Sequence, residues 1–156
     1  MSSISELKER VDTKTLNLVL LSIATVGLYP ILWLWRNGEK ISEVTKQRVG
    51  SDLFIIWIAV CAGWSGALAG SGEVLFDVLS LGFSIALAVL YIVWAFQART
   101  ALQKYALTEH GVDLRMNGFY TFIFTLYYIN YCINDLPEAK KKQDILAGHR
   151  AQTPAA

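Results

Sequence analysis

The chain has 156 residues, of which 54% are hydrophobic and 12% aromatic, and its mean hydropathy is +0.38. Its length allows one domain, and its apolar content exceeds that of an ordinary water-soluble chain. The formal net charge of +1 excludes the broad basic field of a nucleic-acid-binding protein and the acidic bias of a solvating tail. Cys61 and Cys132 lie inside apolar runs, so we expect two packed thiols and no disulfide.

The N-terminus predicts a short amphipathic helix. Ser3 and Glu6 have the spacing of a capping box, and Ile4, Leu7 and Val11 then share one face. Acidic and basic residues balance in this region, and no small-residue cleavage site ends the first apolar run. We therefore expect that run to stay in the protein and not to be removed as a signal peptide.

Four apolar segments follow, at residues 16–35, 53–70, 75–97 and 117–136. About 20 helical residues cross a hydrocarbon core of about 30 Å, so each segment is long enough to enter a bilayer. We predict an all-α integral membrane protein whose single membrane domain occupies residues 1–136. Residues 137–156 predict a polar cytoplasmic tail that is disordered at its end.

The connections between these segments carry helix signals of their own. Residues 37–49 have a weak amphipathic pattern, Gly50 is expected to end that helix, and Ser51 or Asp52 can cap the next one. The third apolar segment has no helix breaker after it, so its helix is expected to continue as far as Gly111.

The distribution of Lys and Arg favours unequal roles for the four segments, because these residues are retained on the cytoplasmic side. If all four segments cross, each side holds seven of the 14 basic residues; if only the second and third cross, all 14 lie on one side. We therefore predict a central transmembrane hairpin, formed by the second and third segments, flanked by two re-entrant or interfacial segments. A four-span helical bundle is the alternative, and both arrangements place the two termini in the cytoplasm.

The outer segments have features that suit a shallow or returning path. Thr25, Gly27 and Pro30 weaken the first segment near its middle, so it can kink or turn back. Tyr and Asn crowd the second half of the fourth segment, and Tyr prefers the headgroup zone of a bilayer. A faint repeat at a constant offset of 98 residues also matches Leu28, Tyr29, Ile31 and Trp33 with Leu126, Tyr127, Ile129 and Tyr131.

The first segment contains the stretch LLSIATVGLYPILWLWRN, in which a Thr, a Gly-x-Tyr, a Trp pair and a basic residue follow one another. This stretch resembles the opening of a family of small bacterial inner-membrane domains of unknown function. The part from FQARTALQKY to FTLYYINYCINDLPE is similar to the close of that family. The resemblance implies a protein of the bacterial inner membrane with no established activity, and it carries over no functional residues.

Small residues recur every fourth position in the second segment, a pattern that is typical of close helix contacts in lipid. The two faces consist of Ala59, Gly63 and Ala67, and of Ala62, Gly66 and Gly70. The third segment has small residues of its own at Ser80, Gly82, Ser84, Ala86 and Ala88. These faces predict either packing within the central hairpin or self-association of the protein.

A candidate polar crevice is predicted from Asp77 and two polar and aromatic stripes. Asp77 is the carboxylate inside the third segment, where it either complements the helix N-terminus or handles an ion or proton. The stripes either line a shared crevice for a lipid headgroup or small solute, or anchor the segments at the membrane interface. They consist of Thr25, Tyr29, Trp33 and Arg36 in the first segment, and of Tyr127, Tyr131 and Asn134 in the fourth.

No enzyme motif is visible in the sequence. His110 and His149 stand alone without ligand spacing, and a phosphate loop, a nucleophile elbow and a close carboxylate pair are all missing. We therefore expect no catalysis, no cofactor, no metal and no nucleic-acid partner.

The function predicted from these features is that of a non-catalytic membrane module. It would act by binding within the lipid bilayer, as a subunit of a membrane complex or as a self-associating scaffold. A small ion or solute conduit is the alternative, and a membrane-embedded lipid-modifying enzyme is the third interpretation.

Overall fold

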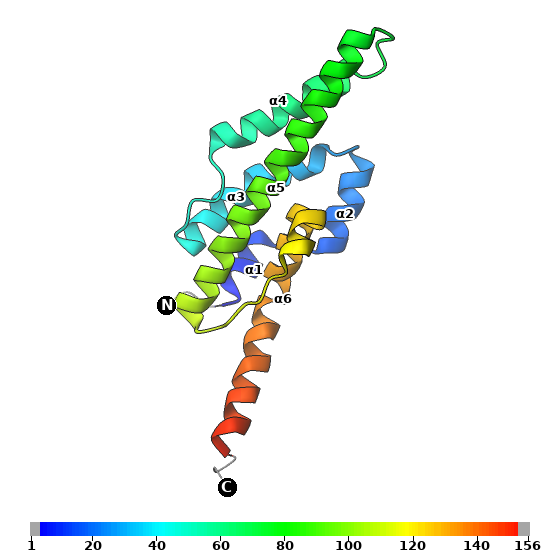
Figure 1. Ribbon diagram of the computed structural model, residues 1–156. Coiled ribbons are helices and arrows are strands. Elements are labelled where there is room, and N and C mark those ends of the chain that lie inside the picture. The colour runs from blue at the N-terminus through cyan, green and yellow to red at the C-terminus, as the bar shows by residue number, and fades with distance from the viewer. Residues whose placement is uncertain (1–3, 153–156) are drawn as a thin grey trace.

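The computed structural model describes residues 4–152, which form helices and connections and contain no strand. The helices are α1 (Glu6–Val11), α2 (Thr15–Ala24), α3 (Leu28–Thr45), α4 (Asp52–Leu68), α5 (Val74–His110) and α6 (Gly118–Gln152). Figure 1 shows the long helix α5 running through the molecule, with α4 beside its first half and the other helices gathered around its second half. The chain is therefore all-α, as its sequence predicts.

The N-terminal helix α1 forms where its apolar periodicity predicts it. Leu7 and Val11 are buried, so the predicted apolar face is the one that packs. The polar side of α1 lies against α3, where Arg10 Nη1 donates a hydrogen bond to Glu43 Oε2 over 3.1 Å. The predicted cap, Ser3, lies outside the described residues.

Helices α4 and α5 form an antiparallel hairpin (Figure 1). The predicted cap Ser51 starts α4, since its Oγ accepts a hydrogen bond from the N–H of Phe54 over 3.3 Å. Within the hairpin, Ser80 Oγ donates to the backbone oxygen of Ser65 over 2.7 Å. This bond joins the two helices through a polar side chain in an otherwise apolar region.

Among the described residues, one helix is long and apolar enough to cross a membrane, and this is α5 with its 37 residues. Helix α4 is apolar as well but has only 17 residues. As predicted, α5 continues without a break to Gly111, which adopts a φ of +64°. There the Gly111 N–H donates to the oxygens of Ala106 and Leu107, and the Val112 N–H also donates to Ala106 over 2.9 Å, so backbone oxygens at the helix end have partners.

In α5, the apolar half is mostly exposed, whereas the more polar half contains most of the buried residues. In its apolar first half, before residue 94, Ser80 is the buried residue, whereas in the more polar second half Trp94, Ala98, Leu102 and Tyr105 are all buried. The exposed large apolar side chains lie largely in α2, α4, the first half of α5 and the start of α6, and include Leu20, Ile23, Ile56, Trp57, Leu75, Leu79, Ile85, Phe119 and Phe122. A water-soluble helical protein buries such side chains, so this surface requires an apolar environment.

The first apolar segment is not a single helix. Helix α2 ends at Ala24, Val26 and Gly27 adopt φ values of +52° and +86°, and α3 starts at Leu28. Figure 1 shows α3 leaving this break in a new direction and passing back across α5. The segment is therefore broken near its middle, where the sequence predicts a kink or a turn.

The helix predicted for residues 37–49 is the second half of α3, and it ends earlier than expected. Lys46, with a φ of +54°, follows the last helical residue, so Gly50 is not the helix stop that the sequence predicts. Gly50 instead adopts a φ of +73° against the buried ring of Trp94. A Cβ at this position would lie 3.0 Å from Trp94 Cδ1, so only glycine fits without displacing that ring.

The fourth apolar segment is also interrupted. An extended connection at residues 111–117 leads into α6, and Thr125 divides this helix with a φ of 40° and a ψ of −116°. Neither value is helical, and a positive φ is rare for a β-branched residue. The segment is therefore a short helix, a break and a second helix, instead of one uniform span.

The second part of α6 extends far into the predicted tail. It passes through Pro137 and reaches Gln152, so the described part of the tail is helical, whereas we expected disorder towards its end. Gln143 supports this extension, because its Oε1 accepts from the N–H of Asp113 over 3.2 Å and its Nε2 donates to the oxygen of Gly111 over 3.3 Å. The last four residues lie outside the described part of the chain.

Candidate functional site

The two outer segments are interrupted at equivalent places. Gly27 and Thr125 lie 98 residues apart, which is the offset of the repeat found in the sequence. A helix resumes directly after each of them, at Leu28 and at Leu126. The repeat thus relates two broken segments. The matched side chains alone do not indicate that both segments are broken.

Hydrogen bonds within the chain hold the first break. Thr25 Oγ1 donates to the oxygen of Leu21 over 2.7 Å and accepts from the N–H of Tyr29 over 2.9 Å. One hydroxyl therefore joins the end of α2 to the start of α3. The N–H of Gly27 reaches the oxygen of Ser22 over 2.8 Å, which leaves fewer open backbone groups at the two helix ends.

Asn117 and Tyr128 brace the second interrupted segment. The Oδ1 atom of Asn117 accepts from the N–H of Phe119 over 2.8 Å and caps the short helix that precedes Thr125. The N–H of Asn117 donates to Tyr128 Oη over 3.0 Å, across the break. The two parts of the segment are thereby held close to each other.

Asn130 and Asn134 of α6 hold the connection between α1 and α2. The Nδ2 atoms of both residues donate to the backbone oxygen of Thr13, each over 2.9 Å. Asn130 Nδ2 also lies 3.2 Å from Thr15 Oγ1, and Asn130 is fully buried. The predicted crevice residue Asn134 therefore joins the two outer segments and does not face an open crevice.

A cavity of about 580 Å³ lies where the two breaks meet the α4–α5 hairpin, and we name it the break cavity. The first break contributes Val26, Gly27, Pro30 and Ile31, and the second contributes Phe122, Ile123, Thr125, Leu126 and Tyr127. The hairpin contributes Ala62, Ser65 and Gly66 from α4 and Leu87, Ala88, Tyr91 and Ile92 from α5. The lining is mainly apolar with a few hydroxyl groups, so it suits an apolar or weakly polar occupant.

The structure brings only part of the predicted polar crevice together. Tyr127 lines the break cavity, and Thr25 and Tyr29 lie at the first break. Two further residues of this cavity, Tyr91 and Thr125, are not predicted from the sequence. Tyr91 has no motif around it. Thr125 could have been found from the repeat, since it lies at the repeat offset from Gly27.

Three other predicted crevice residues lie elsewhere. Trp33 is buried and packs edge-on against Trp94 with ring centroids 6.0 Å apart. Arg36 is exposed on another face of α3. Tyr131 is exposed and stacks on Tyr128. Each stripe is predicted as a single helical face. In the structure, the members of the two stripes are separated by the break before α3 and by the packing of Trp33 against α5.

In the structure, Asp77 makes a contact of the structural kind predicted for it. It lies in the first turn of α5, and its Oδ1 accepts from the N–H of Gly70 over 3.2 Å at the hairpin turn. A carboxylate in the first turn also complements the positive end of the helix dipole. Asp77 is exposed and does not line the break cavity.

The small-residue faces of α4 lie outside its contact with α5. The buried residues of α4 are Ile55, Ile58 and Cys61. Gly63 and Gly66 are exposed, and a Cβ added to either would meet no atom within 4 Å. Ala59, Ala67 and Gly70 are exposed too, while Ala62 is half-buried. Packing within the hairpin and self-association therefore both stay predictions for these faces.

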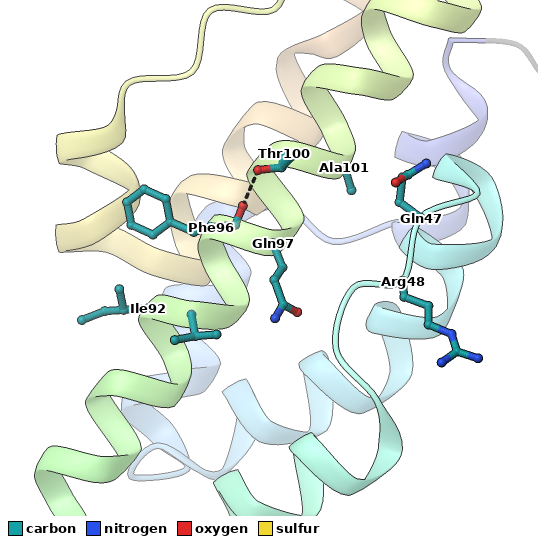
Figure 2. Close-up of a pocket in the computed structure, with 8 residues that line it drawn as sticks. Gln47, Arg48, Ile92, Phe96, Gln97, Thr100 and Ala101 are labelled. Carbon is teal, nitrogen blue, oxygen red and sulfur yellow. Dashed lines mark hydrogen bonds between the residues drawn. The ribbon is translucent and has the colours of Figure 1, made fainter.

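A second hollow, of about 600 Å³, lies between α5 and the connection after α3 (Figure 2), and we name it the Arg48 groove. It is lined by Gln47, Arg48, Ile92, Val93, Phe96, Gln97, Thr100 and Ala101. Gln97 extends from α5 towards this connection, and its Oε1 accepts from the N–H of Gly50 over 3.2 Å. Sequence reasoning did not single out this groove, because its two walls are 45 residues apart along the chain.

A charged cluster lies at the far end of α5. Lys46 Nζ donates to Glu109 Oε1 over 3.0 Å, and this bond, together with the charge of Lys46, holds the pKa of Glu109 below its usual value. Burial lowers the pKa of His110, the charge of Lys140 lowers it further, and Glu109 opposes both effects. The ring of His110 packs edge-on against Tyr105, with centroids 5.0 Å apart.

In the described part of the chain, no three His, Cys, Asp or Glu residues come together in a way that could hold a metal ion. Cys61 and Cys132 are both buried as free thiols, as their apolar surroundings predict.

Over residues 4–152, these observations define an all-helical fold with one helix of membrane-crossing length and two internally broken outer segments. The chain belongs to the family described as domain of unknown function (DUF4234), which matches residues 13–104. This match confirms the resemblance to a family of unknown function, although it ends within α5 and leaves α6 outside. No curated protein matches the chain, and no solved structure matches it either.

Proposed function

We propose that this protein is a non-catalytic module of the bacterial inner membrane that acts by binding, as a subunit of a membrane complex or as a self-associating scaffold. The observation that carries the proposal is the reversed burial of α5. Its apolar half is exposed and its polar half is buried, so the exposed half requires lipid or an apolar partner.

The proposed arrangement has the α4–α5 hairpin crossing the bilayer, with the outer segments entering and leaving on the side of the termini. The 17 residues of α4 rise about 25 Å, close to the thickness of a hydrocarbon core. The breaks at Gly27 and Thr125 support returning outer segments, and all 14 basic residues then lie on one side. Both termini are cytoplasmic in this arrangement.

Cysteine labelling tests the arrangement directly. In a Cys61→Ala, Cys132→Ala background, Ser71→Cys at the hairpin turn is expected to react with an impermeant reagent added outside the cell. Thr108→Cys, near the far end of α5, is the matched position and is expected to react only after the membrane is opened. The four-span bundle predicts the reverse for both positions, so external labelling at Thr108→Cys with none at Ser71→Cys would overturn the two-span arrangement.

Self-association is tested through the exposed small face of α4. Gly63→Leu is tolerated by the monomer, since no atom lies within 4 Å of the new side chain's Cβ. If the face binds a second copy, native mass measurement in mild detergent gives an oligomer for the wild type and a monomer for Gly63→Leu. Val78→Leu, on the exposed face of α5, is the control and leaves the oligomer intact. A wild-type monomer that carries no other protein contradicts the binding function.

A small-solute conduit is the second candidate, because both backbone breaks open onto one cavity beside the hairpin. Broken helices that meet in the middle of a membrane domain commonly form a solute site. Gly66→Leu would fill the break cavity, whereas Asp77→Asn alters a residue at the hairpin turn. A conduit through the cavity predicts flux into proteoliposomes that Gly66→Leu abolishes and Asp77→Asn preserves; wild-type vesicles without flux rule it out.

A further inference from the structure

The Arg48 groove lies where α5 changes character. Phe96 ends the continuous apolar run of this helix, and Gln97 begins its polar half. In the proposed membrane arrangement, this junction is at the level of the lipid headgroups on the cytoplasmic side, where polar and apolar groups of one side chain or ligand are both satisfied. A groove at this level has access to lipid along its apolar end and to water along its polar end.

The apolar end of the groove is open. Val93 and Phe96 are 40% and 36% exposed, and Ile92 is half-buried, so these three side chains form an uncovered apolar strip along α5. The guanidinium of Arg99 lies over the Phe96 ring at 5.8 Å from its centroid and donates to the oxygen of Met116 over 2.8 Å. Arg99 is thus occupied, and it holds Phe96 in place.

The polar end of the groove offers donors without a matching acid. Arg48 is exposed and makes no hydrogen bond or ion pair with any described residue, and no Asp or Glu lines the groove, although Glu39 and Asp52 line a neighbouring hollow that Arg48 also borders. The neighbouring cation, Lys46, is already paired with Glu109. Gln97 uses its Oε1 for Gly50, which leaves its NH2 group available as a donor. An unpaired guanidinium and an amide donor that line the same groove from opposite walls are suited to an anionic group such as a phosphate.

We propose that the Arg48 groove binds one anionic phospholipid, with an acyl chain along Ile92, Val93 and Phe96 and the phosphate beside Arg48. This inference rests on the proposed membrane arrangement. The apolar strip distinguishes a phospholipid from free phosphate, which would use only the polar end. Arg48, the charged residue of the groove lining, favours an anionic headgroup over a zwitterionic one.

The test measures lipid retained by the intact protein in nanodiscs made from equal parts of phosphatidylglycerol and phosphatidylcholine. Native mass spectrometry after release is expected to show one retained phosphatidylglycerol on the wild type. Arg48→Gln is expected to lower this retention at least about tenfold, because it removes a charged hydrogen bond. Arg48→Lys keeps the charge but not the planar fork, so it should retain an intermediate fraction.

Arg115→Gln is the matched control. It removes the same charge from an exposed arginine that pairs with Asp113, away from the groove, and should leave the retention unchanged. Val93→Trp fills the apolar strip without changing charge and should lower retention of both lipids. Equal retention by the wild type, Arg48→Gln and Arg115→Gln overturns the inference, as does complete displacement of the lipid by millimolar inorganic phosphate.

The outcome also separates this inference from the proposed function. A protein that enters nanodiscs and labels at Ser71→Cys from outside, but retains no lipid, contradicts the groove alone. A protein that does not enter nanodiscs contradicts the membrane arrangement itself. A protein that retains a stoichiometric polypeptide at the groove in place of lipid contradicts the choice of ligand.

Discussion

Individual polar side chains fix how the outer segments lie against each other. The backbone oxygen of Thr13 receives two amide donors, Asn130 and Asn134, from one turn of α6. Asn134 Nδ2 also donates to the oxygen of Asn130 over 2.9 Å, so the two amides form a small network. In a network of this kind, the loss of one member is partly offset by the other.

A double-mutant cycle tests this network. Asn130→Ala and Asn134→Ala are each expected to lower the free energy of unfolding by about 1 kcal/mol, because one donor to Thr13 remains. The double variant should lose more than the sum of the two, because the part-buried oxygen of Thr13 then loses both amide donors. Thermal unfolding in detergent gives the values, and Asn17→Ala, on the exposed side of α2, is the control. Strictly additive losses would show that the amides act independently.

The charged cluster at the end of α5 predicts that acid destabilises the protein. The folded-state pKa values of His110 and Glu109 lie below their ordinary values of 6.5 and 4.5, so the unfolded chain binds protons more readily than the folded one. Stability is therefore full above pH 6.5, declines below it as His110 must be charged, and declines again below pH 4.5 as Glu109 loses its ion pair with Lys46.

Two variants separate these steps in thermal unfolding measured between pH 4 and pH 8. His110→Gln should remove the decline that begins near pH 6.5, and Lys46→Met should shrink the one that begins near pH 4.5. The second effect is small, because the ion pair is exposed. Lys104→Met, on the same helix, should change neither step, and a variant profile identical to that of the wild type would contradict the assignment.

At the scale of helices, the sequence predicts most of what local physics decides. The length of α5, its stop at Gly111, the Ser51 cap and the apolar face of α1 all follow from periodicity and end signals within a few residues. The break in the first segment follows as well, because glycine and proline stand at it. These features need no knowledge of distant contacts.

What depends on distant contacts could not be predicted in the same way. Gly50 was interpreted as a helix stop, but the ring that requires it, Trp94, is 44 residues away. The break at Thr125 has neither glycine nor proline, so no local signal indicates it. The small faces of α4 predict either hairpin packing or self-association, whereas the buried residues of this helix are Ile55, Ile58 and Cys61, which the spacing of small residues does not indicate. In each case tertiary packing selected one of several locally allowed arrangements.

The two breaks lead to opposite expectations for mutation. Gly27→Ala places a Cβ at a φ of +86° and should lower the free energy of unfolding by about 1 kcal/mol. Thr125→Gly should raise it by a similar amount, about 1 kcal/mol, because glycine adopts a positive φ without strain. Gly63→Ala, in an open position within α4, should also stabilise, by about 0.5–1 kcal/mol, through helix propensity. Destabilisation by Thr125→Gly would show that its side chain contributes more than its backbone costs.

At the scale of the whole molecule, the exposed and buried tryptophans report the proposed membrane placement. Trp35 of α3 is 65% exposed and Trp57 and Trp64 of α4 are 55% and 53% exposed, whereas Trp33 and Trp94 are buried in the core. In vesicles that contain brominated lipids, adding Trp57→Phe and Trp64→Phe to a Trp35→Phe background should remove most of the quenchable fluorescence, because the two remaining core tryptophans lie away from the acyl chains. Unchanged quenching would place the lipid-facing surface elsewhere.

The hydrogen bonds that Asn130 and Asn134 donate to Thr13 also affect the order in which parts of the chain can fold during synthesis. The two side-chain amides that donate to the Thr13 carbonyl oxygen come 117 and 121 residues later in the chain. A ribosome releases the first apolar segment long before it has synthesised these partners. The α4–α5 hairpin, whose turn is short, can insert during that interval, whereas the N-terminal segment reaches its final position only when α6 emerges. A nascent chain that stops before Asn130 should therefore hold its N-terminal segment loosely and expose it to proteases.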